Sequence, residues 1–166
     1  RAYEDTALPI GYGQTISQPY IVARMTELLL SVSPRTVLEV GTGSGYQAAI
    51  LSRLVDKVYS TERIEALATL ARQRFRQLGY RNIRVQHSDG NWGWPQFGPF
   101  DAIIVTAGGI EIPQPLLEQL QVGGLLVMPL GDRTRQTLVT VTRTPTVFER
   151  VDLEPVVFVP LLGGTG

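Results

Sequence analysis

The sequence predicts a doubly wound α/β domain with a mostly parallel sheet, and three observations support this fold class. Short apolar stretches typical of buried strands alternate with segments of helical periodicity from residue 19 to about residue 128. A glycine-rich turn at Gly41 follows the first apolar stretch and leads directly into a helical segment. After Gly131 the helical pattern stops and the chain alternates as extended segments do. The sheet is therefore expected to end in a β-rich, antiparallel C-terminal edge.

The individual elements follow from local signals. Residues 1–15 lack periodicity and contain proline and glycine, so they are predicted to form a loop. A helix is expected next, with Ser17 as a candidate N-cap and Pro34 beyond its end. The remaining elements are expected in this order: strand 36–40, helix 47–55, strand 57–61, helix 64–78, strand 82–86, strand 101–105, helix 115–120, strand 125–128, and extended runs in 136–142 and 147–159.

Three of these assignments rest on particular residues. The segment 64–78 places apolar side chains at helical spacing and is followed by Gly79, a residue typical of the position after a helix end. The segment 101–105 is apolar and β-branched, as in a strand that is buried on both faces. Gly123 and Gly124 are interpreted as a turn that precedes the strand 125–128.

Length and composition limit the function classes. The chain has 166 residues, enough for a single domain over 1–166, with 43% hydrophobic and 18% charged residues. Fifteen basic residues balance 15 acidic ones, which argues against a nucleic-acid partner held through phosphate contacts. No apolar stretch reaches the roughly 20 residues that span a bilayer. A monomeric, cytoplasmic protein without nucleic-acid or membrane partners is therefore expected.

Metal and thiol chemistry are also restricted by composition. The chain has no cysteine, and His87 is its one histidine. Cysteine-based metal sites and multi-histidine zinc sites are therefore excluded, and no metal is expected. A structural role is favoured for His87 over that of a general base.

The glycine-rich turn has a spacing that indicates its ligand. It runs Glu39-Val40-Gly41-Thr42-Gly43-Ser44-Gly45, which is E-x-G-x-G-x-G and not the G-x-G-x-x-G of dinucleotide sites. Glu62 lies 21 residues after Gly41, close to the roughly 20-residue spacing of a ribose-binding carboxylate. This pattern predicts a pocket for an adenosine-containing cofactor and resembles the first motif of S-adenosylmethionine-dependent methyltransferases. A tight connection without a ligand is the alternative.

Four segments together resemble one family. They are GQTISQP at 13–19, VLEVGTGSGYQ at 37–47, SDG at 88–90 with GWP at 93–95, and PFDAIIVTA at 99–107. These segments are similar to those of protein-L-isoaspartate (D-aspartate) O-methyltransferases, and the resemblance extends from about Leu8 to Leu162. The GQTIS-x-P segment is the most specific, since other methyltransferases lack it.

The resemblance implies a fold, a reaction and a partner. The expected fold is the seven-stranded, Rossmann-like sheet of S-adenosylmethionine-dependent methyltransferases. The expected reaction is methylation of the free carboxylate of L-isoaspartyl residues, and of D-aspartyl residues as an extension, with S-adenosyl-L-methionine as cofactor. The expected partners are proteins and peptides that contain isoaspartate, in flexible and exposed segments. The methyl ester then closes to a succinimide, which opens partly to normal aspartate.

The resemblance also assigns roles to residues. Ser17 is the candidate catalytic residue, and its alternative role is that of a helix N-cap. Glu39 is expected to order the loop near the methionine ammonium group, with a solvated strand-edge glutamate as the alternative. Glu62 is expected to bind the ribose, or to act as a helix N-terminal acid, and both can hold. The expected cofactor-binding residues are Gln14, Thr15, Ile16, Glu39, Gly41, Thr42, Gly43, Ser44, Gly45, Glu62, Asp89, Gly90 and Thr106.

Three of these residues follow the third and fourth predicted strands. Asp89 and Gly90 are expected to line the adenine, although Asp-Gly is also a common turn pair. Thr106, together with Ala107, resembles the wall on the substrate side after the fourth strand.

The chain departs from the family pattern in two places. A further N-terminal helical segment, which packs beside the substrate site in the family, is expected to be missing because the chain opens with Arg1. Gly108-Gly109 stands where the family more often has Ala and Pro, and this change is expected to loosen the loop beside the substrate cleft.

Four alternative functions place different demands on the sequence. A nucleic-acid adenine methyltransferase would need a different motif after the fourth strand, where this chain has Thr106-Ala107-Gly108-Gly109. A small-molecule O-methyltransferase would want a general base or a metal. A binding module with this fold would bind the cofactor without turnover. A nicotinamide dehydrogenase is disfavoured by the loop spacing.

Overall fold

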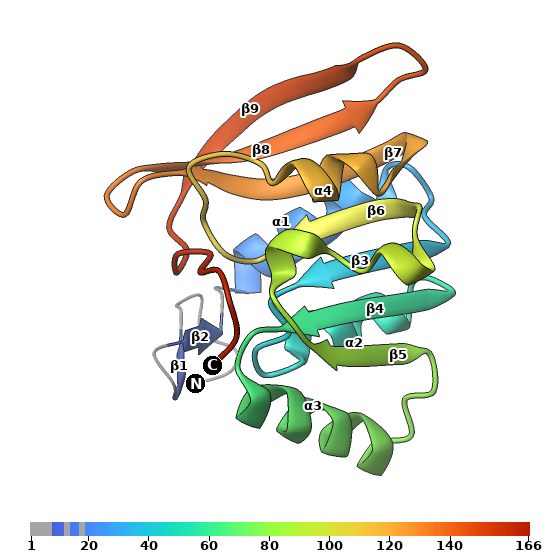
Figure 1. Cartoon of the computed structure of the whole chain (residues 1–166), viewed down its shortest axis with the longest axis vertical. Helices are drawn as coiled ribbons and strands as arrows, with labels where there is room; N and C mark the ends of the chain where they lie inside the picture. The colour runs from blue at the N-terminus through green and yellow to red at the C-terminus, as the bar shows by residue number, and fades with distance from the viewer. Residues whose placement is uncertain (1–7, 12–13, 17–18) are drawn as a thin grey trace.

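The computed structural model describes residues 8–11, 14–16 and 19–166, with side chains from Pro19 onward. Within this part of the chain, seven strands form one sheet in the order β5-β4-β3-β6-β7-β8-β9, and β1 and β2 form a separate pair (Figure 1). The elements are β1 (Leu8–Gly11), β2 (Gln14–Ile16), α1 (Pro19–Leu30), β3 (Thr36–Val40), α2 (Tyr46–Ser52), β4 (Lys57–Glu62), α3 (Glu65–Gln77), β5 (Ile83–His87), η1 (Gly90–Trp92), η2 (Pro95–Phe97), β6 (Phe100–Val105), α4 (Gln114–Glu118), β7 (Leu120–Gly131), β8 (Gln136–Arg143) and β9 (Phe148–Val156).

The sheet has a parallel part and an antiparallel edge. β3 lies between β4 and β6 and runs parallel to both, and β5 and β7 extend the parallel set on either side. β8 pairs antiparallel with β7, and β9 pairs antiparallel with β8. The predicted fold class is confirmed, including the β-rich C-terminal edge. The parallel strands end together at one edge of the sheet, where ligands of such folds bind.

Helices cover the two faces of the sheet unequally. One apolar cluster joins α1, α2 and α3 to a face of the sheet through residues such as Met25, Leu51 and Phe75. The second cluster, on the opposite face, contains Leu116 of α4 and the aromatic residues that flank η2. Alternate residues of β3 enter the two clusters, with Val37 in the first and Leu38 in the second, because successive side chains of a strand point to opposite faces. β3 is therefore buried on both sides, as its apolar sequence requires.

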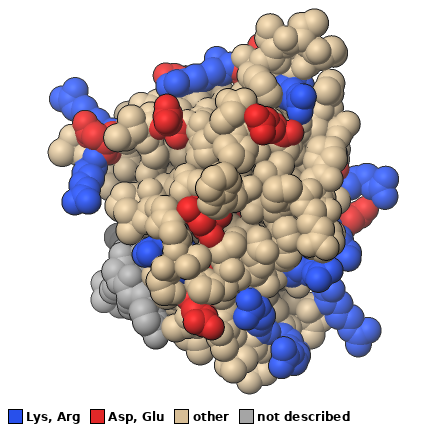
Figure 2. Space-filling view, viewed as in Figure 1, with Lys and Arg blue, Asp and Glu red and all other residues tan. Residues whose placement is uncertain are grey.

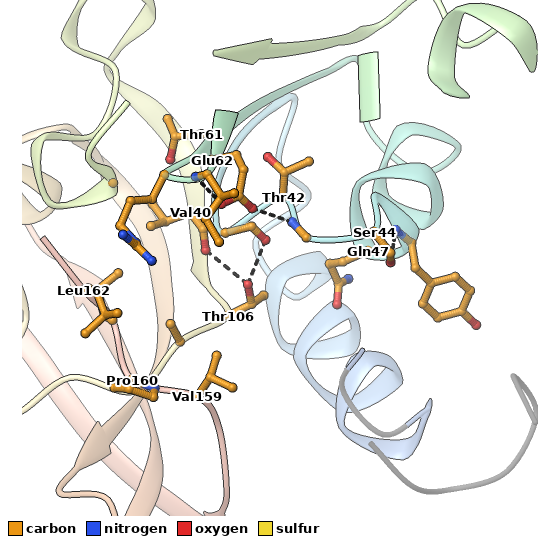
Figure 3. Close-up of a pocket in the computed structure, with 18 of the residues that line it drawn as sticks. Val40, Thr42, Ser44, Gln47, Thr61, Glu62, Thr106, Val159, Pro160 and Leu162 are labelled. Atoms are coloured by element: carbon orange, nitrogen blue, oxygen red, sulfur yellow. Dashed lines mark hydrogen bonds between the residues drawn. The ribbon is translucent and has the colours of Figure 1, made fainter. Parts of the chain in front are cut away.

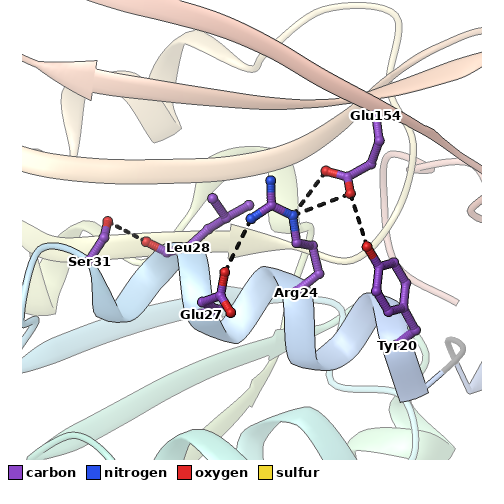
Figure 4. Close-up of polar contacts among 6 residues, drawn as sticks. All are labelled: Tyr20, Arg24, Glu27, Leu28, Ser31 and Glu154. Atoms are coloured by element: carbon purple, nitrogen blue, oxygen red, sulfur yellow. Dashed lines mark hydrogen bonds and ion pairs between the residues drawn. The ribbon is translucent and has the colours of Figure 1, made fainter.

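An ion pair joins the first helix to the last strand. Arg24 of α1 donates to Glu154 of β9 at 3.0 Å and also reaches Glu27 at 3.4 Å (Figure 4). The hydroxyl of Tyr20 donates to Glu154 at 3.5 Å. These groups are exposed or half-buried, so each pair stabilises the fold by about 1 kcal/mol at most. They fix the beginning of α1, which follows the GQTIS segment, against the antiparallel edge of the sheet.

The distribution of charge is uneven although the net charge is zero. In Figure 2 basic side chains gather at the end of the molecule where α3 lies, and charges of both signs are mixed at the β8–β9 end. Two arginines of α3 donate to backbone carbonyls: Arg72 to Val85 at 3.1 Å and Arg74 to Ser44 at 2.9 Å. In the part of the chain that the structure describes, no helix is long and apolar enough to cross a membrane.

The structure corrects three expectations about elements. Residues 8–11 and 14–16 are not a loop but two short antiparallel strands, in which Leu8 pairs with Ile16. The strand expected at 125–128 begins already at Leu120, so Gly123 and Gly124 lie inside β7 and do not form a turn before it. α2 ends at Ser52 and not at residue 55. Short strands rich in glycine and proline lack the alternation of apolar residues that predicts a strand.

Candidate cofactor and active site

A cavity that is partly open to solvent lies at the carboxyl ends of β3, β4 and β6 (Figure 3). The glycine loop after β3 forms one wall, and the end of β4 with Glu62 forms another. Gly90 and Thr106, which follow β5 and β6, also line it. The sheet thus brings together sequence-predicted residues that are far apart in the chain.

The glycine loop has a backbone that needs glycine. Gly41, Gly43 and Gly45 have φ values of 102°, 54° and 89°, a region that side chains disfavour. A Cβ on Gly41 would lie 2.6 Å from the Thr106 hydroxyl oxygen. The amides of Gly41 and Thr42 both donate to the carbonyl of Thr61, at 2.9 and 3.2 Å. The loop is therefore bound tightly to the end of β4 and leaves bare backbone toward the cavity.

Glu62 is a buried carboxylate at the centre of this arrangement. One of its oxygens accepts from the Gly43 amide at 2.8 Å, and the other accepts from the Ile64 amide at 2.9 Å. Its exposed fraction is 6%, and it lines the cavity. Glu62 can serve both as a ribose-binding acid and as an acid at the start of α3, because it lines the cavity and accepts from the Ile64 amide just before α3. Each carboxylate oxygen keeps a further lone pair that can accept a hydrogen bond from a ligand hydroxyl.

Thr106 and Gly90 shape the floor of the cavity. The Thr106 hydroxyl lies 2.9 Å from the carbonyl of Gly41 and 3.1 Å from that of Val40, so it ties the end of β6 to the glycine loop. Gly90 is buried, and a Cβ there would lie 2.3 Å from the Val40 side chain. A larger residue at position 90 would therefore push into the cavity floor.

Glu39 lies beneath the glycine loop and does not line the cavity. Its side chain is fully buried, and it accepts from the Ser60 hydroxyl at 2.5 Å. Burial raises the pKa of Glu39 to about 8, the Ser60 hydrogen bond partly opposes this, and the charge of Glu62 adds to it. The alternative of a solvated strand-edge glutamate was therefore wrong. The sequence offered no sign of burial, because a glutamate beside a glycine turn is usually exposed.

Asp89 directly precedes Gly90 of the cavity wall, is not itself part of that wall, and is hydrogen-bonded within the chain. It accepts from the backbone and side-chain nitrogens of Asn91, both at 2.9 Å, and from the Gly164 amide at 2.8 Å. Burial raises the pKa of Asp89, but these hydrogen bonds and the nearby Arg63 outweigh it and hold the pKa below its usual value. The turn interpretation is confirmed, since Asp89 caps η1.

Sequence reasoning missed the C-terminal segment as a wall of the site. Residues 159–162 line the cavity, and the Leu161 and Gly166 amides donate to the carbonyls of Gly108 and Arg63. Gly108 donates in turn to the Val159 carbonyl at 2.7 Å, and Gly109 donates to that of Pro129 at 3.2 Å. Backbone hydrogen bonds thus hold Gly108-Gly109 on both sides, and the expectation that this pair loosens the loop stays a prediction. Only an apolar run after the last strand could have indicated this wall.

The remaining predicted site residues do not line the cavity, or the structure describes only their backbone, or they lie outside the described residues. Gly45 precedes α2 and does not line the cavity, because it faces the ring of Phe75. Gln14, Thr15 and Ile16 form β2, for which the structure describes the backbone. Ser17 lies outside the described residues. His87 is not part of the cavity wall, and its ring nitrogen lies 2.9 Å from the Arg63 carbonyl.

Comparison with known proteins identifies the family. A family model described as protein-L-isoaspartate(D-aspartate) O-methyltransferase matches residues 1–166. The chain belongs to the protein-L-isoaspartate O-methyltransferase family. The Marinobacter nauticus protein named protein-L-isoaspartate O-methyltransferase 1 is 61% identical over 164 residues, which are 99% of this chain and 75% of that protein.

Solved structures of this family share the fold. One structure, named protein-L-isoaspartate O-methyltransferase, has a TM-score of 0.89 at 30% identity. The match covers 99% of this chain and 55% of the chain in that structure. Another structure, from Plasmodium falciparum in complex with S-adenosyl-L-homocysteine, has a TM-score of 0.86 at 26% identity. That match covers 96% of this chain and 81% of the chain in that structure. The protein is thus an isoaspartyl methyltransferase of this family with S-adenosylmethionine as cofactor.

The residues present fit such a cofactor. The bare backbone of the glycine loop permits close approach, and the buried Glu62 offers acceptors for a pair of vicinal hydroxyls. The match over the whole chain favours this family over the small-molecule, nucleic-acid and nicotinamide alternatives.

Proposed function

We propose that this cavity is the site where S-adenosylmethionine meets the carboxylate of an L-isoaspartyl residue. The buried Glu62 carboxylate beside the glycine loop is the observation that carries this assignment. Glu62 accepts hydrogen bonds from the ribose, and Gly41, Thr42, Gly43 and Ser44 bring their backbone close to the amino-acid end. Gly90 lies against the adenine. Thr106 holds the loop and borders the substrate side.

Asp89 and Glu39 have more indirect roles in this proposal. Asp89 accepts from the Gly164 amide through one oxygen, and the adenine amine would share that carboxylate. Glu39 does not contact the cofactor in this proposal, because Ser60 and then Thr42, which lines the cavity, stand between it and the cavity. Gly45 contributes the turn into α2.

The chemistry requires alignment more than proton transfer. The bound cofactor supplies an electrophilic methyl group on a sulfonium. The isoaspartyl carboxylate has an ordinary pKa of about 4 and is ionised at neutral pH, so it attacks without a base. The protein holds the two reactants in line, which accounts for most of the gain in rate. This explains why His87 is bonded to the backbone and takes no place in the cavity wall.

Several finer points belong to the same proposal. The neighbouring backbone nitrogen then attacks the carbonyl carbon of the methyl ester and methanol leaves, which closes a succinimide without further help from the enzyme, because methoxide is a better leaving group than the oxygen of a free carboxylate. The substrates are flexible, exposed segments of damaged proteins, and D-aspartyl residues are a second substrate class. A single domain over 1–166, a monomeric state and a cytoplasmic location stay predictions.

A pair of matched peptides tests this function. One contains isoaspartate and the other contains aspartate at the same position, and both are incubated with radiolabelled S-adenosylmethionine. Base-labile label is expected on the isoaspartyl peptide alone, because in isoaspartate the main chain runs through the β-carboxyl group and leaves the α-carboxylate free, whereas aspartate offers only its β-carboxylate. Equal labelling of both peptides would contradict the assignment. Cofactor binding by calorimetry without any label would favour the binding-module alternative.

Ser17→Ala is the test of the candidate catalytic residue. We expect kcat to fall by about 10- to 100-fold with little change in the affinity for the cofactor, because a misaligned nucleophile is costly. Ser31→Ala is the matched control, since the exposed Ser31 hydroxyl only donates to the Leu28 carbonyl in α1. If Ser17 is an N-cap and nothing more, the variant instead loses about 1 kcal/mol of stability and keeps its kcat.

A further inference from the structure

Three buried polar side chains form a chain of hydrogen bonds beneath the glycine loop. The Ser60 hydroxyl of β4 donates to a carboxyl oxygen of Glu39 in β3 at 2.5 Å. The Thr42 hydroxyl lies 2.5 Å from the Ser60 oxygen. Either hydroxyl can donate in this second bond. The three side chains thus form one continuous chain of hydrogen bonds from Thr42 through Ser60 to Glu39.

This chain of bonds is shielded from water. Glu39 and Ser60 are fully buried, and Thr42 is 3% exposed. Hydrogen bonds in such an environment are stronger than in water, and a member left without a partner is costly. The other carboxyl oxygen of Glu39 already lacks a partner among the described residues. Loss of the Ser60 bond would leave the whole buried carboxyl without one.

Thr42 is the member that reaches the cavity. It lies between Gly41 and Gly43, whose backbone angles allow the loop many conformations in the absence of restraints. The Thr42 and Gly41 amides bond to Thr61, and the Thr42 hydroxyl bonds to Ser60, so two neighbouring residues of β4 fix the loop from below. Without Ser60, the side chain of Thr42 has no partner that selects one loop conformation.

We propose that Ser60 is a positioning residue that fixes the glycine loop in its cofactor-binding conformation by linking Thr42 to Glu39. This inference rests on the proposed cofactor role of the loop. Ser60 itself does not line the cavity. Because the loop contacts the cofactor equally in the ground state and in the transition state, Ser60 affects cofactor affinity and not the chemical step.

The first experiment compares Ser60→Ala with the wild type. The dissociation constant for S-adenosylmethionine, measured by calorimetry, is expected to rise about tenfold, which corresponds to one buried hydrogen bond. The KM for the cofactor is expected to rise by the same factor with kcat unchanged. Ser52→Ala is the matched control, because the buried Ser52 hydroxyl donates to the Ala49 carbonyl within α2, away from the cavity. It is expected to leave the affinity unchanged.

A second pair of variants removes the other end of the link. Thr42→Val deletes the hydroxyl and keeps the shape, whereas Thr42→Ser keeps the hydroxyl, so only Thr42→Ser is expected to retain the affinity. Combining Thr42→Val with Ser60→Ala is expected to weaken binding no further than one change alone. Amide exchange of residues 41–45 without cofactor is expected to accelerate in Ser60→Ala and in Thr42→Val, and not in the Ser52 control.

The outcomes separate this inference from the proposed function. If the wild type binds S-adenosylmethionine and Ser60→Ala binds it equally well with unchanged loop exchange, the positioning role is wrong and the cofactor site stands. The same conclusion follows if Thr42→Val retains full affinity. If the wild type itself does not bind S-adenosylmethionine, the proposed function and this inference both fail. If Ser60→Ala does not fold, the Thr42 pair decides the question.

Discussion

Glu62→Gln is expected to weaken the binding of S-adenosylmethionine by about 100-fold, because it removes charge-assisted hydrogen bonds that are each worth roughly 1.5–3 kcal/mol. The amide side chain can accept at only one of its two terminal atoms, whereas the carboxylate accepts from Gly43 and Ile64 at the same time. One of these amides, or a ribose hydroxyl, is therefore left without its acceptor inside the cavity wall.

Calorimetric titration with S-adenosylmethionine measures this loss directly. Glu65→Gln is the control, because Glu65 is an exposed acid in the first turn of α3, three residues further along the chain. The control is expected to bind like the wild type. An unchanged affinity in Glu62→Gln would show that Glu62 serves the start of α3 and not the cofactor.

Glu39→Gln is expected to flatten the dependence of stability on pH. The pKa of Glu39 is about 8 in the folded protein, chiefly through burial, against an ordinary value of 4.5. Between these two pH values the folded state binds more protons at Glu39 than the unfolded state does. The contribution of Glu39 to the free energy of unfolding is therefore fully present below pH 4.5 and is lost as pH rises toward 8. At pH 7 the loss for the wild type is on the order of 3 kcal/mol.

Urea denaturation from pH 5 to about 8.5 follows this effect, since the free energy of unfolding can be compared between variants at each pH. The difference in stability between Glu39→Gln and the wild type is expected to shift in favour of the variant as pH rises. Glu149→Gln, in an exposed position on β9, is the control and should show a constant difference. Parallel curves for Glu39→Gln and the wild type would mean that Glu39 is ionised throughout this range.

Local sequence determines the centre of this fold well. The strand predicted at 36–40 matches β3 at both ends, because an apolar run is bounded there by Pro34 and by the glycine turn. Helix α3 agrees with its predicted span to within a residue at each end, since amphipathic spacing and Gly79 mark it clearly. The β7 boundary was less accurate because Leu120 pairs with Phe100, a contact between distant parts of the chain that no local pattern indicates.

In the site, too, local motifs predict some residues, whereas others depend on contacts between distant parts of the chain. Gly41, Glu62 and Thr106 were found from motifs, and the structure brings them to one cavity. Ser60 carries no motif, and its importance depends on the burial of Glu39 and on the register that places it opposite Glu39 in the neighbouring strand. The wall formed by residues 159–162 depends on the path of the chain after β9, which only tertiary packing decides.

The backbone contacts of Gly166 have a practical consequence for handling the protein. The Gly166 amide donates to Arg63 at 2.8 Å, and the Gly166 oxygen accepts from the Glu65 amide at 3.0 Å. Gly166 is thus held against the backbone of Arg63 and Glu65 at the start of α3. A fluorescent label attached near Gly166 would disturb these bonds beside Arg63, which lines the cavity, so a label for ligand titrations is better placed on the exposed β8–β9 hairpin, around residues 144–147.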